Sequence, residues 1–138
     1  MLVETEAIAE STRQVALAFL SAYWRAELAT ALALCAPDAV IELPQSISIV
    51  TPAPIRDVLP GIFGEVYQRF VGGRFEVVIE RTVAEHGAVF VEYRASGDLK
   101  TGHRFDCRYG VVFQLKEKRV VLFRQYTDTQ YVSQALLS

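Results

Sequence analysis

The 138-residue chain lacks several features that define specialised protein classes. It has no run of about 18 apolar residues, so no membrane-spanning helix is predicted. Its two cysteines, Cys35 and Cys107, lie far apart and outside any C-x-x-C motif, and it has only two histidines, so neither a metal site nor a disulfide is expected. The acidic N-terminus lacks the basic and apolar segments of a secretory signal, which favours a cytoplasmic protein.

Charge of either sign is also scarce. Fourteen Lys and Arg stand against 16 Asp and Glu, which gives a net charge of -2. A nucleic-acid partner is therefore not expected, because no overall basic field attracts a phosphate backbone. Apolar residues, in contrast, make up 51% of the chain and include eight Phe, six Tyr and one Trp. This composition and length predict one domain, residues 1–138, with a well-formed core.

Helical periodicity occupies the first half of the chain. Apolar residues recur at three- and four-residue spacing over residues 15–26, with Thr5, Ser11 or Thr12 as candidate N-caps and Ser11 and Gln14 at capping-box spacing. A short second helix is predicted over residues 27–34, ended by Pro37 and Asp38. A third is predicted over residues 52–69, with a kink or break at Pro60 and Gly61.

Strand periodicity dominates the second half. A brief strand is predicted at residues 40–44, and the stretch 45–54 is expected to be a loop with at most one more short strand. Alternation of apolar and polar residues then predicts long strands that begin near Phe75, Val89, Arg104 and Val121, joined by turns at His86–Gly87 and at residues 116–118. Helices followed by an antiparallel meander indicate an α+β fold.

Two segments resemble a known family. Residues 26–44, which run through Ala36-Pro37-Asp38-Ala39, and residues 119–129, which include Arg124-Gln125-Tyr126, are similar to the nuclear transport factor 2-like superfamily, especially its SnoaL-like members. The order and length of the elements agree over nearly the whole chain. The resemblance implies a cystatin-like cone, in which a strongly curved, mostly antiparallel sheet wraps around N-terminal helices and encloses a pocket. It also implies a homodimer through the outer sheet face and no cofactor.

The catalytic patterns of that family are incomplete in this sequence. The resemblance places Leu43, Phe19 and Val111 where a ketosteroid isomerase of this fold has its base and its two oxyanion-binding groups. Hydrocarbon side chains can neither take a proton nor donate one to an oxyanion. The carboxylates of the epoxide hydrolases are also missing, because Ser96 and Gln125 stand at their places. The chain is therefore typical of neither enzyme.

What remains is a predicted apolar pocket with few polar groups. Such a pocket fits a small hydrophobic or aromatic molecule that tyrosine hydroxyls and Gln125 would orient. The alternative is that the aromatic residues simply fill a core. The candidate ligand-binding residues are Phe19, Tyr23, Phe63, Tyr67, Tyr93, Tyr109, Val111, Phe123, Gln125 and Thr127.

Two residues are candidates for proton transfer. His103 has inward parity near the expected pocket mouth, and Asp128 follows the last strand, where SnoaL-like cyclases often carry an acidic residue. Their alternatives are a solvated histidine after the Gly102 turn and a capping aspartate. Two functional hypotheses follow: a small-molecule binding protein or cofactor-free cyclase, isomerase or dehydratase, and a non-catalytic dimeric protein-interaction module.

The opposite face of the strands carries mixed charges. Glu92, Arg94, Asp106 and Arg108 are among residues that can pair across neighbouring strands. A solvated face is one interpretation of this pattern. A homodimer surface is the other, since Arg and Tyr are enriched at protein interfaces.

Overall fold

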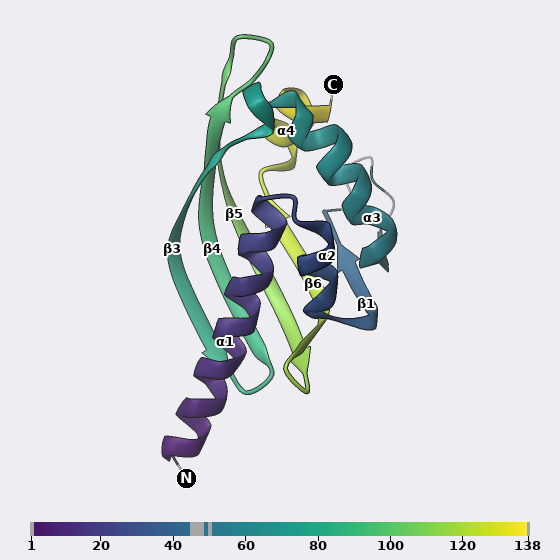
Figure 1. The fold of residues 1–138 in the computed structure, drawn as a ribbon. Coiled ribbons are helices and arrows are strands. Elements are labelled where there is room, and N and C mark those ends of the chain that lie inside the picture. Colours follow the sequence, from purple (N-terminus) through teal and green to yellow (C-terminus); the bar gives the residue numbers. More distant parts are fainter. Residues whose placement is uncertain (1, 45–48, 50, 138) are drawn as a thin grey trace.

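The computed structural model describes residues 2–44, 49 and 51–137 (Figure 1), and the side chains of residues 6–44, 49 and 51–136. Of the loop predicted over residues 45–54, residues 45–48 and 50 thus lie outside the described part. The helices of the first half pack on one face of a curved, unclosed sheet, with α1 lying along its concave side (Figure 1). These helices are α1 (Leu2–Trp24), α2 (Leu28–Ala33) and α3 (Ile55–Gly61).

The sheet has six strands in the order β2-β1-β6-β5-β4-β3. Only the β1–β6 pairing is parallel, and the other four pairings are antiparallel. The α+β prediction is therefore confirmed. The strands are β1 (Cys35–Glu42), β2 (Ala53–Pro54), β3 (Glu76–Glu85), β4 (Ala88–Asp98), β5 (Arg104–Lys116) and β6 (Arg119–Thr127), and the short helix α4 (Thr129–Val132) follows with a π-helical turn at Ser133–Leu137.

Helix α1 starts earlier than the capping residues predict. It begins at Leu2, so Thr5, Ser11 and Thr12 lie inside it and none is its N-cap. Residues 2–10 include three Glu, two Ala and one Leu, which favour helix and extend it upstream. The Thr12 hydroxyl instead donates to the Ile8 carbonyl one turn back, at 2.8 Å.

The first strand is also longer than predicted. Helix α2 ends at Ala33, and β1 already begins at Cys35, so Pro37 and Asp38 lie within the strand and do not end the helix. The pairing of β1 with β6 shifts register between Cys35 and Val40. Such an irregularity tolerates a proline, which cannot donate to the sheet.

The break predicted in the third helix is confirmed. Helix α3 ends at Gly61, directly after Pro60, and a π-helical turn at Ile62–Val66 follows. Proline lacks the N–H that an α-helical hydrogen bond needs, which favours a change of helix geometry here. Two 3-10 turns, Tyr67–Arg69 and Val71–Gly73, complete the connection to β3.

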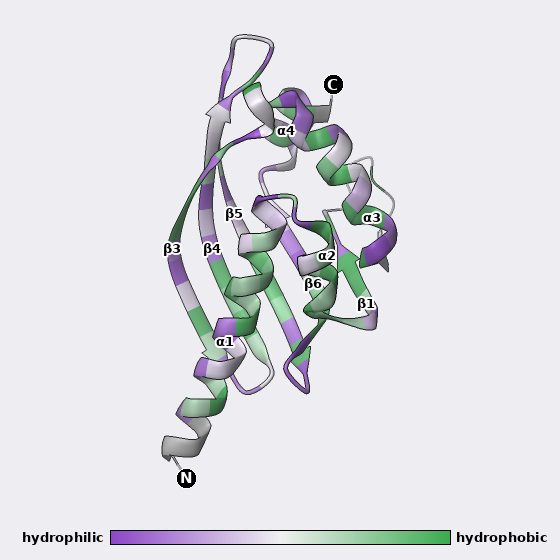
Figure 2. Ribbon diagram, viewed as in Figure 1, coloured by the Kyte–Doolittle hydropathy of each residue, from purple (hydrophilic) through white to green (hydrophobic). Residues whose placement is uncertain are grey.

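The alternation predicted for the long strands matches the burial of their side chains. Along β5, the buried residues alternate with Asp106 and Arg108, which are exposed, and with Gly110 and Val112, which are half-buried; the buried ones are Phe105, Cys107, Tyr109, Val111 and Phe113. Apolar residues are prominent along β1, on α1 and in the middle of the sheet (Figure 2). In β3, Val77 and Ile79 face inward opposite Ala95 and Tyr93, but Ile79 stays 43% exposed because β3 is the edge strand.

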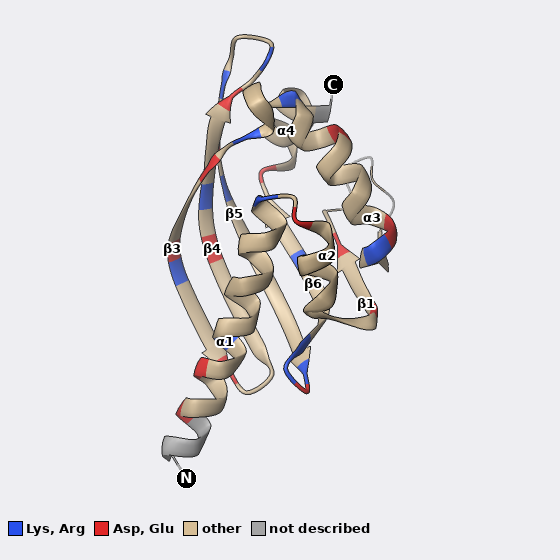
Figure 3. Cartoon of the chain, in the orientation of Figure 1, with Lys and Arg blue, Asp and Glu red and all other residues tan. Residues whose placement is uncertain are grey.

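Charged residues recur along β3 and β4 (Figure 3), and pairs form across the outer sheet face, as predicted. Arg94 lies 3.1 Å from Asp106 on the neighbouring strand, and Arg108 donates to Glu80 at 2.6 Å. The Arg108 hydrogen bond lowers the pKa of the Glu80 carboxyl. Such exposed pairs contribute little to stability, because water and salt screen them. A homodimer through this face stays a prediction.

Gly97 is a position where the fold needs the smallest side chain. It lies on β4 opposite Phe105, and a Cβ there would come within 2.8 Å of the Phe70 ring and 3.0 Å of Phe75 Cβ. We expect Gly97→Ala to lower the free energy of unfolding in urea by about 1–3 kcal/mol, because both aromatic residues must move.

The matched control is Gly64→Ala. Gly64 lies in the π-helical turn with no atom within 4 Å of its added Cβ. Alanine there is expected to leave stability unchanged or raise it by up to about 1 kcal/mol, through its better helix propensity. Equal effects of the two substitutions would contradict this account of Gly97.

Candidate functional site

A cavity of about 80 Å³ lies between the end of α1, the π-helical turn and the concave face of the sheet. One buried water needs about 10–15 Å³, so the cavity has room for several waters or a small molecule. All of its described wall residues are uncharged. They are Tyr23, Trp24, Leu43, Ile49, Ile62, Val66, Tyr67, Phe70, Phe75, Tyr93, Ala95, Phe105, Tyr109, Gln125, Val132 and Leu136.

Several wall residues reach the cavity because of their place in a helix, strand or turn. Tyr23 and Trp24 end α1, which leaves their rings at the open end of the sheet. Tyr93 and Tyr109 are direct partners on β4 and β5 and point to the same inward face. Tyr67 follows the π-helical turn, whose wider geometry carries its ring toward Tyr23, with centroids 6.0 Å apart.

The aromatic rings hold one another in place. Tyr93 and Tyr109 stack with centroids 5.1 Å apart and an angle of 12°, and Trp24 packs edge-on against Tyr93 at 4.8 Å. Tyr67 packs edge-on against Phe75, also at 4.8 Å. Such pairs are worth about 0.5–1.5 kcal/mol each beyond their buried area, so the wall is pre-organised.

Burial keeps the four wall tyrosines protonated. It raises the pKa of Tyr23 to about 12, and the nearby Tyr67 hydroxyl offsets only part of that effect. Burial likewise raises the pKa values of Tyr67, Tyr93 and Tyr109 well above that of free tyrosine. At neutral pH the wall therefore presents phenol groups that can donate hydrogen bonds, and no phenolate.

Two polar atoms of this wall are buried without a hydrogen-bond partner among the described residues. They are the Tyr67 hydroxyl and the Trp24 Nε1. The Tyr67 hydroxyl lies near that of Tyr23, and the Trp24 indole near that of Tyr93, closely enough to offset part of the rise in pKa that burial causes in Tyr23 and Tyr93. Neither contact has the geometry of a normal hydrogen bond. An unpaired buried donor costs about 1–3 kcal/mol, so these two groups call for an explanation.

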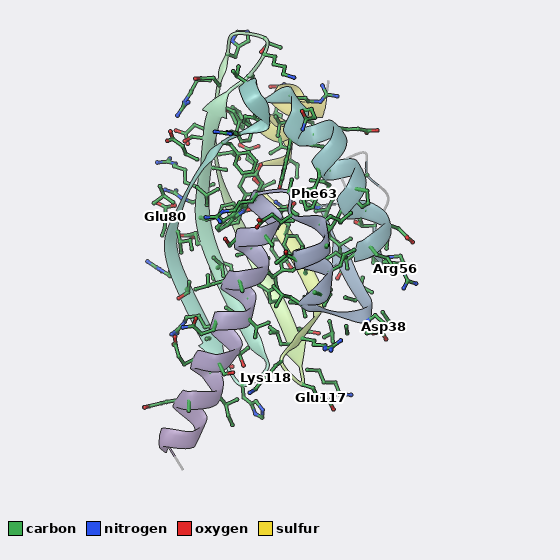
Figure 4. All side chains as sticks on the ribbon, in the orientation of Figure 1. Asp38, Arg56, Phe63, Glu80, Glu117 and Lys118 are labelled. Carbon is green, nitrogen blue, oxygen red and sulfur yellow. The ribbon has the colours of Figure 1, made fainter. Side chains whose placement is uncertain are left out.

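Half of the predicted ligand-binding residues line this cavity: Tyr23, Tyr67, Tyr93, Tyr109 and Gln125. Gln125 is 8% exposed and is one of two buried polar residues in the described part. The other five do not line the cavity wall. Phe19, Val111 and Phe123 are fully buried in the core. Phe63 packs against Tyr23 and Tyr67, between the α3 segment and the sheet (Figure 4). The Thr127 hydroxyl donates to the Arg108 carbonyl.

Neither predicted proton-transfer residue borders the cavity. His103 is exposed in the turn before β5, where it lines a separate surface hollow with Arg69 and Lys100. Asp128 is exposed and caps α4, because its carboxylate accepts the Tyr131 N–H at 3.1 Å. The inward orientation predicted for His103 assumed that it lies on a strand, but β5 begins only at Arg104. Catalytic roles for both residues stay predictions.

Sequence patterns did not predict several of the wall residues. Ala95 and Phe105 have the inward parity of their strands and could have been added on that ground. Trp24 is the last residue of α1 and lies one position beyond Tyr23, off the apolar face that the helical spacing defines. Phe70 and Phe75 flank the turn at Gly72 and Gly73, and only the tertiary fold brings them to the wall.

Comparisons with known proteins agree with this architecture. The sequence model of the SnoaL-like domain matches residues 16–123, which confirms the predicted resemblance. No curated protein sequence matches the chain.

Solved structures of NTF2-like proteins superpose over most of the chain. An NTF2-like protein from Burkholderia thailandensis is 23% identical, with a TM-score of 0.75 over 90% of this chain and 95% of that chain. An NTF2-like protein of unknown function from Burkholderia pseudomallei is 16% identical, with a TM-score of 0.79 over 93% and 98%. An LEH-like epoxide hydrolase from M. tuberculosis is 25% identical, with a TM-score of 0.69 over 94% and 91%. These likenesses support the predicted cone.

The raised tyrosine pKa values predict how the protein behaves in alkali. The unfolded chain should form tyrosinate near pH 10, the ordinary pKa of tyrosine, whereas the folded cavity keeps its phenols protonated. The folded state therefore holds more protons above pH 10, and its stability should fall as the pH rises from about 10 to 12.

Ultraviolet absorbance of tyrosinate, measured with circular dichroism on the same samples, checks this. At about pH 11 the folded protein should show far less tyrosinate than the same chain in denaturant. Full ionisation of all six tyrosines while the fold is intact would contradict the buried wall.

Proposed function

This chain belongs to the SnoaL-like domain family, and we propose that it binds a small, largely apolar molecule in the cavity beneath α1. The observation that carries the proposal is the character of the wall. Aromatic and aliphatic side chains make up nearly all of its described residues, among which Gln125 is the one amide. Ligand sites are commonly apolar clefts with a few polar groups that fix orientation.

The wall favours binding over acid–base catalysis. General acid–base catalysis needs a group whose pKa lies near the working pH. None of the described wall residues is a carboxylate, imidazole or amine, and the pKa values of its phenols are raised away from neutrality. The likeness to an epoxide hydrolase therefore carries the fold to this chain but not a pair of catalytic carboxylates at the cavity.

The size of the cavity limits the ligand. Sites for drug-sized molecules usually enclose about 300–1,000 Å³, far above the volume seen here. We therefore propose a molecule of roughly one ring. To catalyse a cyclisation, isomerisation or dehydration of such a molecule, the protein would need a proton-transfer group from outside the described wall.

Filling the cavity should abolish binding. Ala95 lies on the wall and is 4% exposed, so Ala95→Leu places three extra carbons in the space that a ligand would occupy. We expect the wild type to bind ethylbenzene. The fluorescence of Trp24, the one tryptophan of the chain, should change when the ligand binds. The Ala95→Leu variant should show no such change.

The control for this experiment is Ala33→Leu on the exposed side of α2, which adds the same atoms away from the cavity. It should bind as the wild type does, and thermal unfolding should show that all three proteins are folded. Wild-type fluorescence that does not respond at saturating ethylbenzene, or an undiminished response in folded Ala95→Leu, would contradict the proposal.

The surface positions of His103 and Asp128 lead to a separate prediction. Because both lie outside the wall, His103→Ala and Asp128→Asn should leave ethylbenzene affinity within about twofold of wild type. Asparagine also keeps the capping acceptor of α4. A large loss of affinity in either folded variant would show that the side chain reaches the ligand.

A further inference from the structure

The two unpaired donors in the wall indicate what chemical group the ligand carries. Trp24 Nε1 and the Tyr67 hydroxyl are buried with no hydrogen-bond partner among the described residues, and both residues line the same cavity. Tyr67 is only 6% exposed, so in the free protein its hydroxyl can be reached only by water inside the cavity, and a ligand that displaces such water must supply the acceptor itself. Native proteins leave few buried polar groups unpaired, and those that remain often mark a functional site.

The donor type decides the ligand chemistry. An indole N–H can only donate, so its partner must be a hydrogen-bond acceptor. A phenol can donate or accept, but burial raises the pKa of Tyr67 well above its ordinary value, so the group keeps its proton and can donate it. The remaining wall phenols, Tyr23, Tyr93 and Tyr109, are protonated for the same reason.

The uncharged wall argues against a ligand whose acceptor is an anion. A carboxylate or phosphate would need a positive partner, and none of the described wall residues is Lys, Arg or His. Burying an unpaired charge costs far more than burying a neutral oxygen. A hydrocarbon, at the other extreme, fills the space but leaves both donors unpaired.

We propose that the cavity selects a neutral molecule with a carbonyl-type oxygen, which accepts hydrogen bonds from Tyr67 and Trp24. This inference rests on the proposed function and specifies the substrate class of the same site. A carbonyl oxygen has two lone pairs and can therefore accept from two donors, while the apolar body of the ligand would contact the surrounding rings. The aromatic pairs that fix Trp24 against Tyr93 and Tyr67 against Phe75 hold the donors in place before the ligand arrives.

The test compares three one-ring ligands by isothermal titration calorimetry: acetophenone, ethylbenzene and benzoate. They are similar in size but carry a ketone, no oxygen and a carboxylate, respectively. We expect the wild type to prefer acetophenone over ethylbenzene by about three- to tenfold, which is the usual net value of one hydrogen bond. Benzoate should not bind at neutral pH.

Variants then assign the preference to the donors. Tyr67→Phe and Trp24→Phe each remove one donor and keep a ring, so each should reduce the acetophenone preference, and the double variant should abolish it. Ethylbenzene affinity is measured for the same variants, so that the acetophenone preference is a ratio taken within each protein. Tyr126→Phe is the matched control, because Tyr126 is 54% exposed on the outer face and should not change the preference.

A stability measurement gives a second readout without any ligand. Since the Tyr67 hydroxyl is buried and unpaired, Tyr67→Phe should leave the unfolding midpoint in urea unchanged or raise it. A marked fall would mean that the hydroxyl has a partner in the free protein, which would overturn the inference. So would equal affinities for acetophenone and ethylbenzene, or a preference that persists in the double variant. Failure of every ligand to bind would instead overturn the proposed function itself.

Discussion

The site depends on how the first helix packs against the concave face of the sheet. Phe19, fully buried near the middle of that contact, touches Phe113 and Phe123 with ring centroids 5.7 Å away in each case. Phe113 and Phe123 are themselves direct partners on β5 and β6, so Phe19 on the helix packs against two neighbouring strands at once. Because this contact fixes the position of α1, it also fixes where the last turn of the helix places Tyr23 and Trp24. The cavity lies beyond that packed centre, where the helix ends but the curved sheet continues.

This arrangement gives the domain a dense half and an open half. The dense half, around Phe19, supplies burial worth about 1.5–3 kcal/mol for each large apolar side chain. The open half retains empty volume and two unpaired donors, both of which lower stability. Departures of this kind from complete packing and pairing are expected at functional sites. A ligand that fills the cavity and accepts from Tyr67 would reverse both costs at once.

Sequence patterns predict the two halves unequally well. The long strands and their inward faces follow from strict alternation, as along β5, because a buried sheet face imposes a period of two. Of the five predicted ligand-binding residues at the wall, Tyr93, Tyr109 and Gln125 follow from the same alternation and Tyr23 from the apolar face of α1, whereas Tyr67 lies in the turns after α3. Periodicity could not separate Phe19, which the packed centre covers, from Tyr23 one turn later, since both have the same helical phase. Nor could it place Phe70 and Phe75, which the turns after α3 bring to the wall. The predicted start of α1 and the predicted role of Pro37 in ending a helix were wrong for local reasons. Good helix formers extend α1 upstream, and a register shift accommodates Pro37 within β1.

The central claim is that the cavity is a binding site with its donors facing the ligand. Intermolecular nuclear Overhauser effects between acetophenone and the protein test it most directly, since they report which side chains lie within a few ångströms of the bound molecule. We predict contacts from the ligand to the rings of Trp24, Tyr67 and Tyr93, which converge on the cavity from α1, the turns after α3 and β4. Contacts confined to exposed residues such as Tyr126 or His103, or none at saturating ligand, would contradict the account.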